Sequence, residues 1–146
     1  MTDSALPEKL AEIREDFLAL AEPERLQLLL EFSQELPPIP VEYEGHPELC
    51  ERVAECQSPV YIVVDVDEDG IVAMHATAPA EAPTTRGFAS ILAQGLTGLT
   101  VADALAVPDD YPQSLGLTRA VSPLRIAGMT GMLLRAKRQI QRKSGA

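Results

Sequence analysis

The chain has 146 residues, of which 46% are hydrophobic and 23% are charged. These values are ordinary for one globular domain and exclude disordered and fibrous classes of protein. The net charge of −10 disfavours general nucleic-acid binding, because an acidic body repels phosphate groups. No uncharged apolar run approaches the roughly 18 residues of a membrane-spanning helix. We therefore expect a single cytoplasmic domain over residues 1–146, with a core over about 10–140 and a loose basic tail over 141–146.

Charge is divided unevenly along the chain. Residues 1–110 hold all 22 acidic residues against five basic ones, whereas residues 111–146 hold seven basic residues and no acidic one. Basic residues at a helix end are favoured by the helix dipole. They would equally form a docking surface for an acidic partner, and the sequence leaves both interpretations open.

Two helices are predicted at the N-terminal end. The first begins at Ser4, a residue type that caps helices well, and continues with apolar residues at helical spacing. The second has Pro23 in its first turn and ends at Pro37, because proline cannot continue a helix. Both helices therefore precede an irregular, proline-rich segment over residues 37–49.

A β-hairpin is predicted in the middle of the chain. Residues 60–64 form a β-branched run of strand length, residues 67–70 have the composition of a tight turn, and residues 71–77 form the returning strand. After an Ala/Pro-rich loop, Thr84 or Thr85 is expected to cap a third helix.

Two further helices complete the predicted fold. Thr100 is expected to cap a short helix over residues 101–105. The last helix has Ser122 as its cap and Pro123 at the first helical position, where a missing amide hydrogen costs nothing. The pattern indicates an α+β fold, with helices packed around a small antiparallel sheet of about three strands.

Two patterns suggest metal binding, but neither is complete. Residues 65–70 match the first half of an EF-hand loop, yet Ala76 stands where the loop needs a carboxylate. A disulfide between the two cysteines is not favoured in a reducing cytosol. We expect no metal site, because the zinc-type ligands have no standard spacing and fall on two elements: His46, Cys50, Cys56 and His75.

Cys56 stands just before the first predicted strand, where a short loop would present its thiol at the surface. Composition alone fits a buried small hydrophobic residue equally well. Glu51 and Glu55 would raise the pKa of this thiol if they lie near it, and basic residues would oppose them. We therefore expect the thiol to be fully activated, as a thiolate, only when a partner protein is bound. The candidates to oppose the two glutamates are Arg52, Arg86 and Arg125.

Arg52-Val53 followed by Cys56-Gln57-Ser58 and a strand resembles the SufE family of sulfur acceptors, whose signature reads Arg-Val-x-Gly-Cys-Gln-Ser. The chain departs from the pattern in three places: Glu55 replaces the usual glycine, Ala127 replaces the usual asparagine, and residues 82–85 replace a Ser-Asp-Ala stretch. Other segments similar to family motifs follow in the same order: Arg86-Gly87, Leu115-Gly116-Leu117 and Ser122-Pro123-Leu124-Arg125.

The resemblance implies that Cys56 accepts sulfur as a persulfide from a SufS-type cysteine desulfurase, a PLP enzyme. It further implies that the protein stimulates that enzyme, relays sulfur to an iron–sulfur cluster scaffold and holds no cofactor of its own. Cys50 lies outside the family pattern and is interpreted as a bystander. The residues expected to support Cys56 are Arg52, Gln57, Ser58, Arg86 and Arg125.

Two alternatives stay open at this stage. The chain would be an adaptor or regulator of a desulfurase that carries no sulfur, or a carrier served by a rhodanese-like sulfurtransferase. The chain has no cofactor-binding lysine motif and no second catalytic cysteine motif. A sulfur carrier and desulfurase activator is therefore favoured over an independent enzyme.

Overall fold

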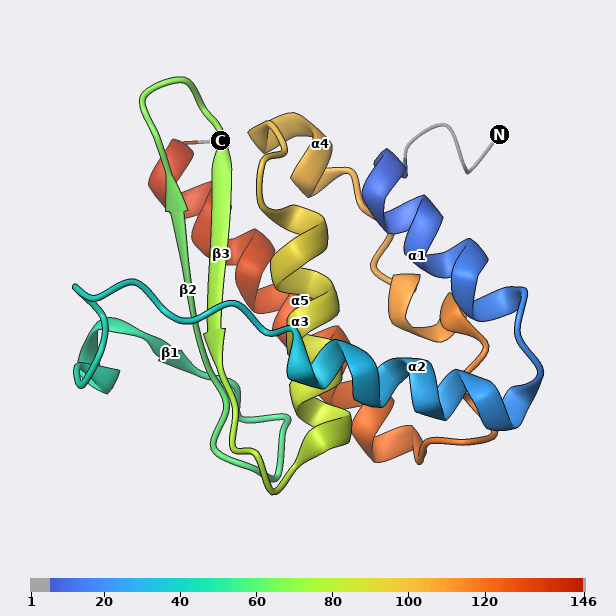
Figure 1. Cartoon of the computed structure of the whole chain (residues 1–146). Coiled ribbons are helices and arrows are strands. Elements are labelled where there is room, and N and C mark those ends of the chain that lie inside the picture. The colour runs from blue at the N-terminus through green and yellow to red at the C-terminus, as the bar shows by residue number, and fades with distance from the viewer. Residues whose placement is uncertain (1–5, 146) are drawn as a thin grey trace.

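The computed structural model describes residues 6–145, so the expected cap at Ser4 lies outside the described residues. Within these residues, five α-helices and three strands make up the α+β fold that the sequence predicts (Figure 1). The same part of the chain has two short 3₁₀ turns, at Pro47–Leu49 and Tyr111–Leu115. The elements are α1 (Glu8–Leu18), α2 (Glu22–Gln34), β1 (Glu51–Arg52), β2 (Tyr61–Val66), β3 (Val72–Thr77), α3 (Pro83–Leu96), α4 (Val101–Leu105) and α5 (Pro123–Ser144).

The sheet is antiparallel throughout, in the order β1-β2-β3. The predicted hairpin is confirmed: β2 and β3 pair from Tyr61 opposite Thr77 to Val66 opposite Val72. Asp67 closes its turn, because Oδ1 accepts hydrogen bonds from the amides of residues 69 and 71, at 2.9 and 3.0 Å. The returning strand begins one residue later than predicted, since the residue before it bridges to the segment ahead of α4 instead.

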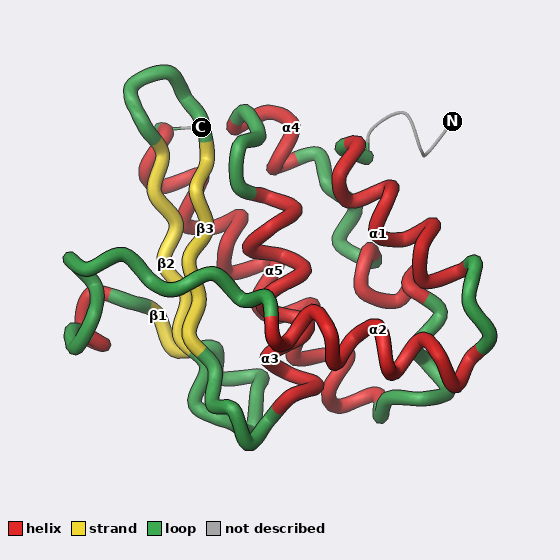
Figure 2. Tube along the Cα trace, viewed as in Figure 1, coloured by secondary structure: helices red, strands yellow, loops and turns green. Residues whose placement is uncertain are grey.

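One face of the sheet carries the core. Residues of β2 and β3 that face this side are buried, except the partly exposed Val66 at the end of β2, with α3 packed against β3 and α5 against β2. The opposite face is crossed by the irregular segment between α2 and β1, as the green trace in Figure 2 shows. Tyr43 of that segment donates a hydrogen bond to Asp65 of β2 at 2.6 Å.

Two glycines let the N-terminal helices lie close to α3. A Cβ on Gly87 would come within 2.5 Å of the Leu29 carbonyl oxygen of α2. A Cβ on Gly95 would come within 2.1 Å of the Leu10 side chain of α1. Leu29 and Leu10 are completely buried, so α3 is the central helix on which α1 and α2 rest.

The second helix ends earlier than expected, since α2 stops at Gln34 rather than at Pro37. The expected caps of three helices can also be checked. Thr100 and Ser122 are the caps of α4 and α5, each accepting a hydrogen bond from the amide three residues on. The cap at Thr84 or Thr85 is wrong: α3 begins at Pro83, whose fixed φ suits the first helical position, and Thr84 is buried in the first turn.

The expectation of a loose basic tail over residues 141–146 is also wrong for residues 141–145, which the structure describes. α5 continues through Ser144 and ends at Gly145, whose φ of +75° favours glycine. Nothing before Gly145 breaks the helix, and Lys143 Nζ donates to the Val64 carbonyl of β2. In the part of the chain that the structure describes, no helix is long and apolar enough to cross a membrane.

Gly87→Ala is predicted to destabilise the fold by about 2 kcal/mol, because the added methyl group meets a backbone carbonyl that has no room to move. Urea unfolding measures this directly. Thr85→Ser, at a partly exposed position of the same helix, is the control and should change stability by no more than about 0.5 kcal/mol. Equal stability of the two variants would contradict the close approach of α2 to α3.

Candidate functional site

Cys56 lies in the loop that joins β1 to β2, residues 53–60, here called the thiol loop. The loop is closed by backbone hydrogen bonds from the Val53 amide to the Val60 carbonyl, at 2.9 Å, and from the Cys56 amide to the Val53 carbonyl, at 3.1 Å. Val53 and Val60 are completely buried, and Cys56 is only 7% exposed. The structure therefore supports a sequestered thiol rather than one displayed at the surface.

The thiol loop packs against a face of α5 where two glycines, Gly128 and Gly131, stand in place of larger residues. A Cβ on Gly128 would lie 3.0 Å from Cys56 Sγ. A Cβ on Gly131 would lie 2.7 Å from the carboxyl carbon of Glu55. These two glycines, three residues apart on one helix face, are what allows the loop to approach α5 so closely.

The next turns of the same helix face hold the loop by hydrogen bonds and ion pairs. Arg135 donates from Nη1 to Glu51 Oε2 at 2.6 Å, and from Nε and Nη2 to the two carboxylate oxygens of Glu55 at 2.8 and 3.3 Å. Gln139 donates to Glu51 Oε1 at 3.0 Å and accepts a bond from the Val64 amide at 2.7 Å. One stripe of α5 thus fixes the thiol loop, β1 and β2.

Sequence analysis missed Gly131, Arg135 and Gln139. The available signal was their spacing after Gly128, at three, seven and eleven residues, which places all four on one helix face. For Gln139, the signal was a polar residue within an apolar helix face. Such a residue needs a hydrogen-bond partner when it is buried, as Gln139 is.

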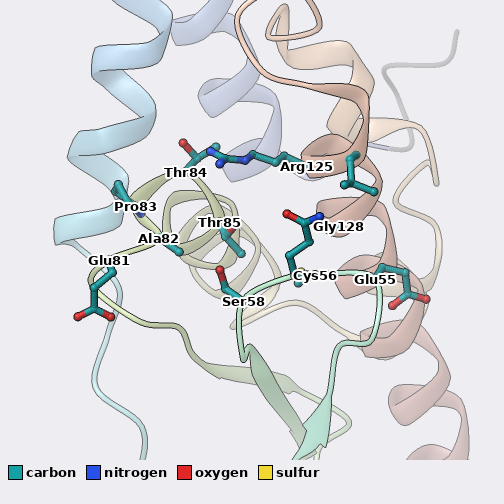
Figure 3. A pocket seen from close by; sticks show the side chains of 12 residues that line it. Glu55, Cys56, Ser58, Glu81, Ala82, Pro83, Thr84, Thr85, Arg125 and Gly128 are labelled. Carbon is teal, nitrogen blue, oxygen red and sulfur yellow. The ribbon is translucent and has the colours of Figure 1, made fainter.

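A pocket of about 170 Å³ opens beside Cys56, between the first turns of α3 and α5. Figure 3 shows Arg125 extending along one side toward Thr84, with Ser58 and Thr85 on the other side. Gln57 and Ser58 of the thiol loop line the pocket, and so does Arg125. The complete lining is Glu55, Cys56, Gln57, Ser58, Glu81, Ala82, Pro83, Thr84, Thr85, Leu124, Arg125 and Gly128.

Burial raises the pKa of the Cys56 thiol to about 11, and the negative charge of Glu55 contributes to this shift. The positive charges of Arg135 and Arg52 lower the pKa of the same thiol by a smaller amount. The expected opposition between Glu55 and Arg52 is therefore present, with burial as the larger cause. The thiol is protonated at neutral pH in this conformation.

Arg86 does not line the pocket. Its Nε donates to the Ser33 carbonyl at 2.9 Å and its Nη1 to the Ala78 carbonyl at 2.6 Å. Arg86 therefore ties the end of α2 to the segment between β3 and α3, and its role is structural. Arg52 lies on β1 with an exposed side chain.

The residues considered as zinc ligands are not gathered at one place. His46 pairs with Glu48 at 2.9 Å and His75 with Asp65 at 3.3 Å. Both cysteines are free thiols, and Cys50 lines a separate pocket from Cys56. Within residues 6–145, no group of three or more His, Cys, Asp or Glu side chains is placed to hold a metal ion.

The Gly128–Cys56 contact predicts an energetic coupling. Alanine in place of a helical glycine ordinarily stabilises by about 1 kcal/mol. Gly128→Ala should lose this gain, because its methyl group presses on Sγ, and Cys56→Ala should restore it. Urea unfolding of the two single variants and the double variant should give a coupling of about 1 kcal/mol. Additive effects would contradict the contact.

Stability should depend on pH through Cys56. The unfolded thiol loses its proton near pH 9.0, whereas the folded thiol keeps it to about 11, so the unfolded state binds fewer protons between these values. The free energy of unfolding of the wild type should therefore fall relative to Cys56→Ala as pH rises from about 9 to about 11. Urea unfolding across this range measures the difference, and a constant difference would contradict the raised pKa.

Known proteins resemble this chain over most of its length. A family model described as "SufE: Fe-S metabolism associated domain" matches residues 11–140. An uncharacterized SufE-like protein of Mycobacterium tuberculosis is 49% identical over 94% of this chain and 95% of its own length. SufE-like protein 1, chloroplastic/mitochondrial, of Arabidopsis thaliana is 30% identical over 88% of this chain and 33% of that longer protein. The solution structure of a hypothetical protein from Thermus thermophilus superposes with a TM-score of 0.83 at 35% identity, covering 97% of this chain and 99% of that one.

Proposed function

The chain belongs to the SufE family of Fe-S metabolism associated domains, and from this premise we propose that it carries sulfur as a persulfide on Cys56. Its donor is a SufS-type cysteine desulfurase, whose turnover it stimulates, and its acceptor is an iron–sulfur cluster scaffold. The observation that carries the proposal is the position of the two cysteines: only Cys56 lines the pocket between α3 and α5.

The proposed transfer is a thiol exchange at the outer sulfur of the donor's persulfide. The Cys56 thiolate attacks that sulfur, a new S–S bond forms on Sγ, and the donor's own S–S bond breaks. The donor cysteine leaves as a thiolate and takes up the proton that Cys56 has released. No external oxidant or reductant is needed, because the outer sulfur moves between two thiols.

The buried thiol explains why a partner is needed for this reaction. At a pKa of about 11, roughly one Cys56 in ten thousand is a thiolate at pH 7. A donor that draws the thiol loop away from α5 would remove the burial that causes most of this shift. The same burial protects the free protein from oxidation of its thiol.

Several groups of the pocket favour an anionic sulfur species once Cys56 is loaded, and they act against the negative charges of Glu55 and Glu81 in the same lining. The first turns of α3 and α5 meet there, and helix N-termini favour negative charge. Arg125 adds a full positive charge at the same place, while Ser58 and Thr85 offer hydroxyl donors. These groups support the roles proposed for Gln57, Ser58 and Arg125 around a persulfide.

The low exposure of Cys56 also favours a second candidate function. An adaptor that stimulates a desulfurase without carrying sulfur would have no need of an accessible thiol. A rhodanese-like sulfurtransferase is a further candidate donor for the carrier itself. We further propose that the protein works in the cytoplasm, where both of its cysteines stay reduced.

Intact mass after incubation with a cysteine desulfurase and L-cysteine tests the proposal. Wild type and Cys50→Ser should gain one sulfur, about +32 mass units that are lost on reduction, whereas Cys56→Ser should not. Stimulation of the desulfurase with no sulfur on any of the three proteins would overturn the carrier and support the adaptor. If there is neither sulfur nor stimulation, the desulfurase is not the donor, and a rhodanese-like sulfurtransferase is tested in the same way.

A further inference from the structure

Glu55 and Arg135 connect the thiol loop to α5 at the point where Cys56 is buried. Glu55 immediately precedes Cys56, and both of its carboxylate oxygens accept hydrogen bonds from the Arg135 guanidinium, at 2.8 and 3.3 Å. A paired, planar contact of this kind fixes orientation as well as distance. Figure 3 shows Glu55 at the edge of the pocket, beside α5.

Arg135 is itself held firmly. Its side chain is 18% exposed, and its Nη1 donates to Glu51 of β1 at 2.6 Å. Glu51 is fixed in turn by Gln139, at 3.0 Å. Arg135 is therefore anchored on α5 by a second partner, and Glu55 is the more exposed member of the pair.

We propose that Arg135 is a positioning residue for the sulfur transfer: its ion pair with Glu55 holds the thiol loop closed over Cys56, and the pair must open before a donor reaches the thiol. The proposal rests on the function given above, because it concerns access to Cys56. It assigns a role to the glutamate that replaces the glycine expected from the resemblance.

The surroundings of the pair make such an opening feasible. The side chain of Glu55 is 42% exposed, so its carboxylate can turn into water without becoming buried and unpaired. Arg135 keeps Glu51 as a partner when Glu55 leaves, so no cation is stranded in a buried place. Gly128 and Gly131 have no side chains that the departing loop would have to displace.

Alkylation of Cys56 by iodoacetamide at pH 8 tests the proposal, in a Cys50→Ser background so that one thiol reacts. The charges acting on Cys56 are Glu55, Arg135 and Arg52, and Glu81 and Arg125 also line the pocket. Through charge alone, Glu55→Gln would lower the pKa of the thiol and speed the reaction, whereas Arg135→Gln would raise it and slow the reaction.

If the ion pair holds the loop closed, the alkylation rates of the variants follow a different pattern. Both Glu55→Gln and Arg135→Gln should speed alkylation by about three- to tenfold, the range expected for the loss of a partly exposed ion pair with paired hydrogen bonds. The double variant should react no faster than Arg135→Gln, because that variant has already lost the Glu55–Arg135 pair together with the Arg135–Glu51 pair. Arg135→Lys, which keeps the charge but not the planar fork, should fall between wild type and Arg135→Gln.

Arg138→Gln is the matched control. It removes a cation from the same helix that lowers the pKa of Glu55 by its charge, but it leaves the Glu55–Arg135 pair intact. Its alkylation rate should stay within about twofold of wild type. Urea unfolding of every variant shows that the fold is retained, and Glu55→Gln keeps the Arg135–Glu51 pair in any case.

Two outcomes would overturn the proposal. If Glu55→Gln reacts faster and Arg135→Gln slower than wild type, the pair acts on Cys56 only through charge. If neither variant changes the rate, the pair does not hold the loop. The reagent needs no sulfur donor, so either outcome leaves the test of sulfur transfer by intact mass unaffected.

Discussion

The site depends on the close approach of the thiol loop to α5, which is possible because Gly128 and Gly131 leave that helix surface bare. Close approach removes water from Cys56, and the loss of water is the main cause of its raised pKa. The same approach brings Glu55 within reach of Arg135. Burial, protonation and the ion pair therefore arise from one packing contact, and moving the loop changes all three together.

This arrangement reconciles two demands on a sulfur carrier. Between partners, the thiol must resist oxidants and stray thiols, which burial at 7% exposure and protonation at neutral pH both provide. With a donor bound, it must be exposed and ionised. In the proposed carrier, a loop fixed at its two ends by the β1–β2 pairing and tied to α5 by one partly exposed carboxylate would meet both demands.

Local sequence signals predicted the parts of the fold that depend on them. The caps at Thr100 and Ser122 and the hairpin turn at Asp67 follow from side-chain chemistry within a few residues. Contacts between distant segments left no such signal: Arg135 meets Glu55 across 80 residues of sequence. For Arg86, a local motif suggested the wrong place. The motif indicated a role at the thiol, but the Arg86 side chain donates to the backbone carbonyls of Ser33 and Ala78.

Labelling of the two cysteines in one sample of the wild-type protein tests the central claim, that α5 sequesters Cys56 in the free protein. Both thiols are free, and Cys50 is the more exposed of the two. Limited alkylation at pH 7.5, followed by peptide mass analysis, should modify Cys50 well before Cys56, and the difference should vanish in urea. Labelling of Cys56 as fast as Cys50 in the folded protein would contradict the account.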